Sequence, residues 1–446
     1  MAVPLAATTA SNVMARIRKI LQSFAGPIFA VVLAMVAGSI VIMVTTPGSL
    51  PDRLSGAVAA YQALLYGAFG SGQNLSFTLT TVTPLILASI SVALTFRAKL
   101  FNIGAGGQLA MGGMTAGVIG FELPHAPGWV LIPLMIIGGI IAGAIWGGIA
   151  GFLKAWRGAH EVVTTIMLNW IAFFFTNYLI NGPFQSLHTA NQTDPIPTQA
   201  TLPHISNFYN YTLGTFLPKI ANPSLYFVDV GFFFSLLALV IYWFIISRTT
   251  FGYEVRVIGE NPKAAHYAGI PIKRNIFLVM AIGGAFSGLA GALQLMGQFP
   301  YQLIANTFAT QSTGFDAIGV ALLGRTTSIG VFLASLLFGG LRQGGTYMQI
   351  SAGVPGDIVY IMQALVLFSI AAEFLASIQR SLRRRSISRR AALSPSGLAT
   401  AVAPLPDTLD ERDLNNRGKD NGNVPEQIAP VRDKSGDTIN RPPTEE

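Results

Sequence analysis

The sequence predicts an all-α polytopic membrane protein with about ten membrane segments and both termini on the cytoplasmic side. Hydrophobic residues make up 51% of the 446 residues and charged residues only 11%, against about 25% charged in a typical soluble protein. The mean hydropathy is +0.53. Residues 1–378 contain ten acidic and sixteen basic side chains, and the last 68 residues contain the other ten and twelve. The chain is therefore apolar over most of its length and ends in a polar tail.

Long apolar runs give the positions of the membrane segments, because a hydrocarbon core of about 30 Å needs about 20 apolar residues in helical form. The first run follows Arg16, Arg18 and Lys19 and is too long for the apolar region of a signal peptide, so we predict an uncleaved first helix. The candidate segments are 27–46, 77–96, 101–121, 129–153, 161–180, 227–247, 276–296, 358–378 and a slightly short one at 327–344.

Basic residues between these segments orient the chain, since cytoplasmic loops carry an excess of lysine and arginine. With the N-terminus inside, the external loops 47–76 and 181–226 carry one basic residue each. Helix parity then requires a tenth segment at 314–324, and its eleven residues predict a broken or partly re-entrant segment shielded by protein. This topology places Arg342 on the outer side, where the rule does not favour it. The residues that fall inside are Arg97, Lys99, Lys154, Arg157, Arg248, Arg256, Lys263, Lys273 and Arg274.

Composition divides the chain into three parts. Residues 1–26 form a basic cytoplasmic segment, 27–378 form the membrane domain, and 379–446 form a basic juxtamembrane segment followed by a tail. The run RSLRRRSISRR suits anchoring at anionic headgroups. The tail after it mixes Pro, Ser, Asp, Arg and Asn without periodicity, which predicts disorder.

Absent motifs exclude several kinds of chemistry. The chain has no cysteine, its five histidines show no ligand spacing, and it has no GxxxxGK[ST] motif with which to hydrolyse a nucleotide by itself. We expect no catalytic residue, no metal site and no cofactor on this chain. The net charge of +8 is explained by the cytoplasmic loops, so we expect no nucleic acid partner.

Polar residues inside the apolar segments are candidates for a solute path. An amide that faces lipid has no partner, and each unmet polar group costs several kcal/mol. For Asn102 and Gln108 the sequence favours two roles equally: contact with the solute, or a hydrogen bond to the backbone of a neighbouring helix. The candidates are Asn102, Gln108, Asn169, Asn177, Gln294 and Asp316. Such a path suits a neutral, hydrogen-bonding solute. The ionisable candidates, Glu161 and Asp316, lie near segment ends, which disfavours proton coupling.

Two further patterns concern packing and repetition. The stretch FNIGAGGQLAMGGMTAG holds six glycines in seventeen residues, and we interpret them first as positions where membrane helices pack closely. The segments VALTFR at 92–97 and VALLGR at 320–325 share four of six residues, a faint internal repeat of the kind found in transporter folds.

The longest internal loop, 248–275, has features of a docking surface. Its sequence RTTFGYEVRVIGENPKAAHYAGIPIKR offers a turn at Gly259 to Pro262 and then a short helix, KAAHYAG, that ends at Gly269. A short helix that exposes alanines to the cytoplasm is suited to binding in the cleft of a partner.

Five stretches resemble the permease subunits of bacterial ATP-binding-cassette (ABC) importers of the branched-chain amino acid and simple-sugar type, most of all the nucleoside-uptake permeases. They are FNIGAGGQLAMGG, HEVVTTIMLNWIAFFFTNYLI, FGYEVRVIGENPKAAHYAGI, GGAFSGLAGALQ and GFDAIGVALLGRTTSIGVFLASLLFGGL, in order within about residues 10–380. The loop matches the family's coupling loop at Gly252, Glu254, Arg256, Gly259, Asn261, Ala264, Ala265 and Gly269. Relatives carry an acidic residue where this chain has Gly106, and an extended tail is not typical of them.

The resemblance implies a transport subunit of the bacterial inner membrane that imports nucleosides and performs no chemistry. A separate ATPase, which carries ATP and magnesium, is expected to dock on the loop, and a second related permease to complete the pore as a heterodimer. A substrate-binding lipoprotein or periplasmic binding protein would deliver the solute. The alternatives are a simple-sugar permease, an ion-driven carrier that needs no partner, and a membrane scaffold that recruits partners through its tail.

Overall fold

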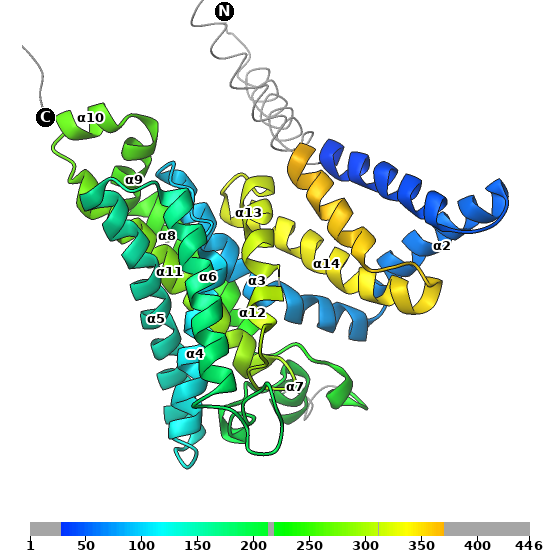
Figure 1. Ribbon diagram of the computed structural model, residues 1–446. Helices are drawn as coiled ribbons and strands as arrows, with labels where there is room; N and C mark the ends of the chain where they lie inside the picture. The colour runs from blue at the N-terminus through cyan, green and yellow to red at the C-terminus, as the bar shows by residue number, and fades with distance from the viewer. Residues whose placement is uncertain (1–27, 213–217, 311, 370–446) are drawn as a thin grey trace, which may run out of the picture. The chain divides into compact units, whose positions relative to one another are not determined.

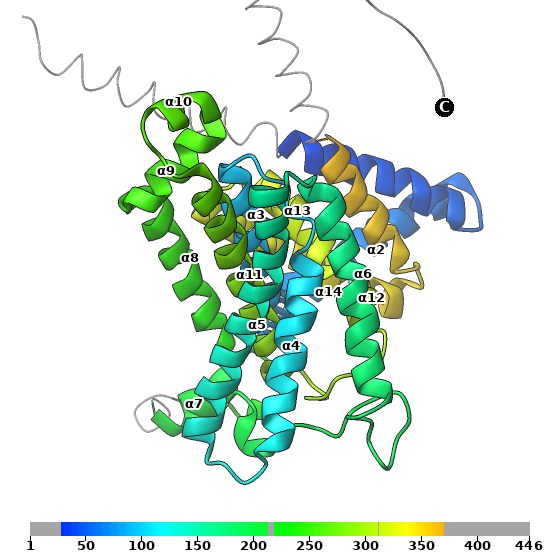
Figure 2. The same ribbon diagram turned by 60° about the vertical axis from the view of Figure 1, so that its left-hand side comes forward.

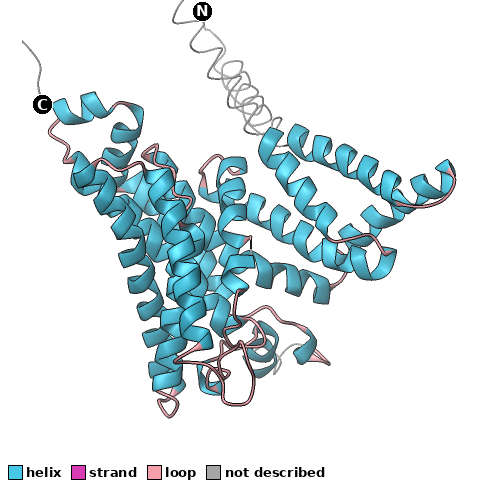
Figure 3. Ribbon diagram, in the orientation of Figure 1, coloured by secondary structure: helices cyan, strands magenta, loops and turns pink. Residues whose placement is uncertain are grey.

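The computed structural model describes residues 28–212, 218–310 and 312–369, and these are almost entirely helices and connecting loops (Figure 3). The chain divides into two units, 1–377 and 378–446, and all described residues belong to the first. The predicted basic segment 1–26 and the tail 379–446 lie outside the described residues.

Most helices follow one another with short connections, and a long loop after α6 leads to α7. The first described helix covers Ile28–Thr45 and the last Asp357–Ser369. Between them lie α2 (Leu50–Phe69), α3 (Gly72–Arg97), α4 (Ala105–Glu122), α5 (Gly128–Arg157), α6 (Glu161–Asn181), α7 (Ile205–Thr212), α8 (Gly231–Arg248), α9 (Thr250–Glu260), α10 (Pro262–Tyr267), α11 (Ile272–Gly297), α12 (Thr307–Thr310), α13 (Thr313–Leu323) and α14 (Ser328–Ala352).

Six helices among the described residues are long and apolar enough to cross a membrane, and each matches a predicted segment. They are Ile28–Thr45, α3, α5, α6, α8 and α11. The other four predicted segments are also helical, as α4, α13, α14 and Asp357–Ser369, but they are shorter or less apolar. The eleven residues of α13 form the short helix expected at 314–324. The total of ten segments and their orientation stay predictions.

The segment 47–76 is not the loop that we predicted, because it contains α2. The helix begins where the backbone N–H of Ser49 donates to Asp52 Oδ2 at 3.0 Å, with Pro51 in its first turn. The residues that follow are rich in alanine and leucine, which are strong helix formers. The face with Ala57, Ala60 and Leu64 is buried, and α2 packs against α14.

Two helices, α3 and α11, lie at the centre of the packing. In their most apolar windows 78% and 61% of the residues are buried, against 22–33% in the other four candidate spans. Helix α11 packs against α3, α4 and α5, and α3 packs in addition against α8, α13 and α14. The elements around them are therefore positioned by these two helices.

The glycines of α4, α5 and α11 bring the three helices into backbone contact. A Cβ on Gly143 would lie 2.6 Å from the Cα of Gly288, and one on Gly288 would collide with the carbonyl oxygen of Gly139. A Cβ on Gly112 would likewise meet the backbone of Gly288. On α5 the glycines recur every four residues, so they form one buried stripe. The isoleucines Ile137, Ile141 and Ile145 form an exposed stripe suited to lipid.

The described helices of the first unit leave it with two distinct ends (Figures 1 and 2). Helices α9 and α10 lie at one end, and α7 with the long loop after α6 lies at the other. The α9 end also carries the basic C-termini of α3, α5 and α8. This grouping agrees with the charge pattern from which the orientation was predicted.

We predict that Gly143→Ala destabilises the protein, because its Cβ would meet the backbone of α11, which cannot move aside as a side chain can. The expected loss is about 1–3 kcal/mol, measured as a lower unfolding temperature in detergent. Gly148→Ala is the matched control on the same helix, since its Cβ would lie 3.3 Å from the side chain of Phe277. Equal unfolding temperatures for the two variants would contradict the role given to the glycine contacts.

Candidate functional site

Asn102 and Gln108 lie in a closed amide cluster at the start of α4. Gln108 Nε2 donates to Asn102 Oδ1 at 3.2 Å, and Asn102 Nδ2 donates to Gln108 Oε1 at 3.2 Å. Asn102 Nδ2 also lies 3.2 Å from the hydroxyl of Ser91 on α3, and its Oδ1 accepts from the backbone N–H of Gly104 at 3.0 Å. Asn102 and Gln108 are fully buried. In this conformation they bond to protein, and their contact with solute stays a prediction.

Asn169 fastens α6 to the same helix start. Its Oδ1 accepts from the backbone N–H of Gly107 at 2.7 Å, and its Nδ2 donates to the carbonyl oxygen of Ile103 at 2.8 Å. Gly106 touches α13, since a Cβ on Gly314 would lie 2.5 Å from the Cα of Gly106. The start of α4 is therefore held by α3, α6 and α13 together.

Gln294 faces a cavity of about 240 Å³ at the end of α11. From α11 it is lined by Gly291, Gln294 and Leu295, and Gln298 follows directly at the C-cap of the helix. Gln294 and Leu295 lie three and four residues after Gly291, so the three share one helix face. The remaining walls come from the segment 299–304 and from Thr307 and Phe308.

Asn177 on α6 lies near this cavity. Its Oδ1 accepts from the backbone N–H of Asn306 at 3.0 Å, and its Nδ2 donates to Asn306 Oδ1 at 3.1 Å. Asn306 precedes Thr307, which lines the cavity. The structure thus brings two of the six predicted path residues, Asn177 and Gln294, to one region.

Asp316 lies at the beginning of α13, apart from the amide cluster. The hydroxyl of Ser312 donates to Asp316 Oδ2 at 2.7 Å. Arg342 Nη1 lies 3.4 Å from the hydroxyl of Thr313, in the same turn. Arg342, which the charge rule did not favour, thus lies beside the acidic start of α13 rather than in an open loop.

The cavity wall 299–304 is held in place by the long loop after α6. The backbone N–H of Thr193 donates to the carbonyl oxygen of Leu303 at 2.9 Å, and that of Ile196 donates to Tyr301 O at 2.9 Å. Gln192 and Ile304 form an antiparallel bridge. Strand-like pairing of the two segments makes the wall a defined surface.

Tyr301 of this wall belongs to a group of titratable side chains, of which Asp229 is buried and Tyr301 and His204 are partly buried. The hydroxyl of Tyr301 is 3.1 Å from Nε2 of His204. Asp229, two residues before α8 begins, accepts from the backbone N–H of Gly231 at 2.6 Å. Burial raises the pKa of the Asp229 carboxyl to about 6, although the Gly231 bond opposes this. The predicted segment 227–247 includes Asp229, but the observed apolar helix α8 begins only at Gly231, so this group lies outside it.

At the opposite end, α9 and α10 form a hairpin, here called the coupling hairpin and defined as residues 250–269. Several of its predicted residues hold it onto the membrane helices. Arg256 Nη1 donates to the carbonyl oxygen of Ile246 at 2.5 Å on α8. Asn275 Nδ2 on α11 donates to Glu254 Oε2 at 2.7 Å.

The glycines of the coupling hairpin allow close approach or an unusual turn. A Cβ on Gly252 would collide with the carbonyl oxygen of Ile245, and one on Gly259 with that of Arg97 on α3. Gly269, with a φ of +73°, ends α10 in a backbone conformation that favours glycine. These glycines fix the position of the hairpin.

Helix α10 presents most of its surface to solvent. Asn261 begins it by accepting from the backbone N–H groups of Lys263 and Ala264 at 3.0 and 3.2 Å. Ala265 is buried, whereas Ala264 is exposed and Tyr267 is 91% exposed. Within the predicted set, Ala264 is thus available to a partner and Ala265 is not.

Comparison with known proteins agrees with this arrangement. Residues 74–371 match the family described as "Branched-chain amino acid transport system / permease component". The chain belongs to this permease family. It is 37% identical to the guanosine ABC transporter permease protein NupP of Bacillus subtilis over 78% of this chain and 93% of that protein.

Two further relatives point to related solutes. The nucleoside ABC transporter permease protein NupB of Lactococcus lactis is 33% identical over 79% of this chain and 92% of NupB. The glucose ABC transporter permease protein TsgB13 of Haloferax volcanii is 34% identical over 71% and 81%. Bacillus subtilis and Lactococcus lactis each have a second related permease, named NupQ and NupC respectively. No solved structure matches the chain.

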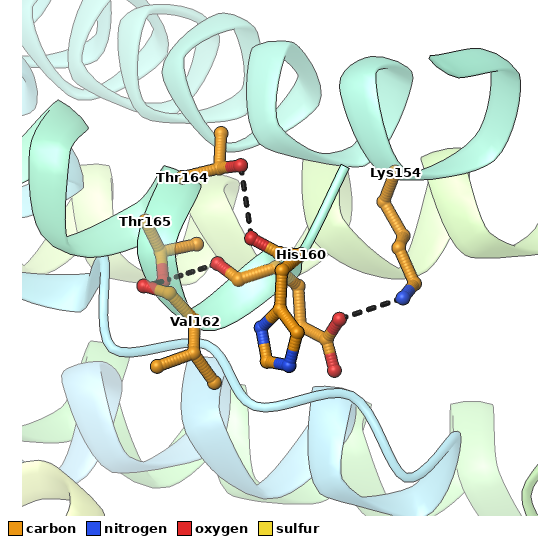
Figure 4. A network of polar contacts seen from close by, with 6 residues as sticks. Lys154, His160, Val162, Thr164 and Thr165 are labelled. Atoms are coloured by element: carbon orange, nitrogen blue, oxygen red, sulfur yellow. Dashed lines mark hydrogen bonds and ion pairs between the residues drawn. The ribbon is translucent and has the colours of Figure 1, made fainter. Parts of the chain in front are cut away.

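The ionisable residue Glu161 of the permease is held in an ion pair. Lys154 Nζ at the end of α5 lies 2.7 Å from Glu161 Oε2 at the start of α6 (Figure 4). The hydroxyls of Thr164 and Thr165 accompany it by donating to backbone carbonyl oxygens one turn back (Figure 4). The pair joins the ends of two helices.

Arg97 of the permease is a residue whose contacts sequence reasoning did not anticipate. Its Nη2 donates to the carbonyl oxygen of Thr326 at 2.7 Å, which also accepts from the hydroxyl of Tyr242 at 2.7 Å. Arg97 ends the first copy of the internal repeat, VALTFR, and Thr326 directly follows the second copy, VALLGR, so the two copies (together the VALxxR repeat) lie close together. The repeat was the sequence feature that could have indicated this contact. Phe299, Gln302 and Phe308 were also missed, because they lie in the irregular segment after α11 and in the four-residue helix α12, which are too short to show a periodic pattern.

The buried carboxyl of Asp229 gives the permease a pH-dependent stability. Its pKa is raised from 3.8 to about 6 on folding, so the folded state binds more protons between these values and unfolding becomes easier as the pH rises from 4 to 6. The effect is roughly 3 kcal/mol, at about 1.4 kcal/mol per pKa unit.

We expect Asp229→Asn to gain stability relative to the wild type as the pH is raised from 5 to 7, measured as unfolding temperatures in detergent. Asp357→Asn, at an exposed residue, serves as the control and should follow the wild type. A constant difference between Asp229→Asn and wild type across this range would contradict the prediction.

Proposed function

We propose that this chain is the membrane permease of an ATP-driven importer of nucleosides in a bacterial inner membrane. The observation that carries the proposal is the coupling hairpin, which is anchored to α3, α8 and α11 by buried contacts and exposes α10 to a partner. A separate ATPase docks there and supplies ATP and magnesium. The permease itself then has no catalytic residue and needs no cofactor.

The orientation follows from the same hairpin. With α9 and α10 in the cytoplasm, the basic ends of α3, α5 and α8 lie inside and the cavity at the end of α11 lies toward the outside. Both termini are then cytoplasmic, and the ten segments cross the membrane as predicted. A binding protein, lipid-anchored or periplasmic, delivers solute to the outer end.

A second, homologous permease completes the path. NupP and NupQ of B. subtilis are both guanosine permease proteins, and NupB and NupC of L. lactis are both nucleoside permease proteins. We propose that this chain likewise pairs with a second, related permease to form a heterodimer. The predicted path residues Asn102, Gln108, Asn169, Asn177, Gln294 and Asp316 would border the passage when the helices rearrange.

Uptake of labelled guanosine and uridine by a strain that lacks this gene tests the proposal. Uptake should be lost and should return with the full-length gene. Unchanged uptake in the deletion strain would refute the nucleoside assignment. The 34% identity to a glucose permease favours a sugar permease as the second candidate, and competition by ribose without competition by nucleosides would establish it.

Docking on α10 gives a separate prediction. Ala264→Trp should uncouple ATP hydrolysis from uptake, because Ala264 is exposed on α10 and a large ring there would block the fit of the ATPase. The conservative Ala264→Ser should retain coupling. Uptake and ATP hydrolysis are measured together in vesicles with equal amounts of inserted chain. Normal coupling in Ala264→Trp would remove the docking assignment.

A further inference from the structure

The cavity at the end of α11 combines flat aromatic rings with amides. Phe308 forms part of its apolar wall and lies over α4, where a Cβ on Gly113 would be 3.1 Å from Phe308 Cζ. Phe299 lines the opening and is 76% exposed. Rings in this position are suited to stacking against the π-face of a planar solute.

Two glutamines of the cavity are fixed by one hydrogen bond each. Gln298 Nε2 donates to the carbonyl oxygen of Thr80 at 3.0 Å, and Gln302 Nε2 donates to Gln192 Oε1 at 2.8 Å. An amide group has two N–H donors and an acceptor oxygen. Each side chain is therefore oriented by protein and keeps both a donor and an acceptor with which to bind a solute.

The lining also indicates which part of a solute fits. None of the residues around this cavity, all of which the structure describes, carries a charge, and Leu295, Leu303 and Ile304 make much of the wall apolar. A ribose would leave hydroxyls facing these side chains without partners, which is costly. A heterocyclic base has apolar faces and a polar edge, and bases are bound elsewhere by this combination of stacking and amide contacts.

The size of the cavity fits one part of a nucleoside better than the whole molecule. Its volume of about 240 Å³ is below the roughly 300–1,000 Å³ of sites that enclose a whole small molecule. The pairing of 299–304 with the loop after α6 holds the walls in place before a ligand arrives, which reduces the entropy lost on binding.

We propose that this cavity is a binding site for the heterocyclic base of a nucleoside, with the ribose left outside. The assignment rests on the proposed function and names the part of the solute that the permease recognises. It makes the base, rather than the sugar, the determinant of selectivity at the outer end of the path.

The absence of cysteine from the chain permits a direct occupancy test. Ile304→Cys places a thiol in the cavity wall, at a side chain that is 38% exposed, and Leu187→Cys places one on the loop after α6, at a side chain that is 94% exposed. Both are labelled with N-ethylmaleimide in vesicles that contain the complete transporter. Guanosine should slow the labelling of Ile304→Cys severalfold, ribose should not, and neither should affect Leu187→Cys.

A transport measurement supports the occupancy test. Phe299→Leu should lower guanosine uptake at limiting concentration about 5- to 150-fold, because stacking on a base is worth roughly 1–3 kcal/mol. Phe299→Tyr, which keeps an aromatic ring, should retain wild-type guanosine uptake. Phe208→Leu is the matched control, since Phe208 is 57% exposed on α7 and does not line the cavity.

The outcomes separate the two proposals. If the wild type imports guanosine but guanosine does not protect Ile304→Cys, or ribose protects it equally, the base-site assignment is overturned and the nucleoside importer stands. If Phe299→Leu transports guanosine as Phe208→Leu does, the assignment is also overturned. A wild-type complex that imports no nucleoside overturns the proposed function and the base site with it.

Discussion

Backbone contact between glycines of α4, α5 and α11 is the constraint on which the rest of the structure depends. Helices in a membrane gain nothing from hiding apolar surface, because lipid is equally apolar, so close packing and hydrogen bonds must hold them together. Gly112, Gly143 and Gly288 meet at distances that admit no Cβ. Their contact fixes the course of α11, which carries the cavity at one end and Asn275, the partner of Glu254 on α9, at the other.

The side-chain amides of the membrane segments also hold the helices together, through hydrogen bonds. Asn102, Gln108 and Asn169 bond one another or the first turn of α4, where backbone groups have no partners within the helix. An amide buried without such bonds would be strongly destabilising. The glycine-rich stretch can therefore lie in an apolar environment because α3 and α6 supply the hydrogen bonds that its backbone and side chains require.

The sequence predicts much of the fold, because length and hydropathy are the properties that a bilayer selects. It predicts the exposed α10 as well, since the turn and the small residues of 259–269 are local features. It does not reveal α2, whose Asp52, Arg53 and Gln62 make the segment resemble a loop. Nor does it reveal the cavity, because Phe299, Gln302 and Phe308 are brought together by tertiary pairing with the loop after α6.

The contacts of Arg97 connect the coupling hairpin to both halves of the VALxxR repeat. The backbone of Arg97 lies against Gly259 of the hairpin, and its side chain donates to Thr326 at the α13–α14 turn. A displacement of α9 must therefore move the end of α3, and through Thr326 it reaches α13, whose Gly314 touches Gly106 at the start of α4. Since packed backbones leave little room to absorb such a shift, under the proposed function motion at the hairpin would reach the helices that border the proposed path.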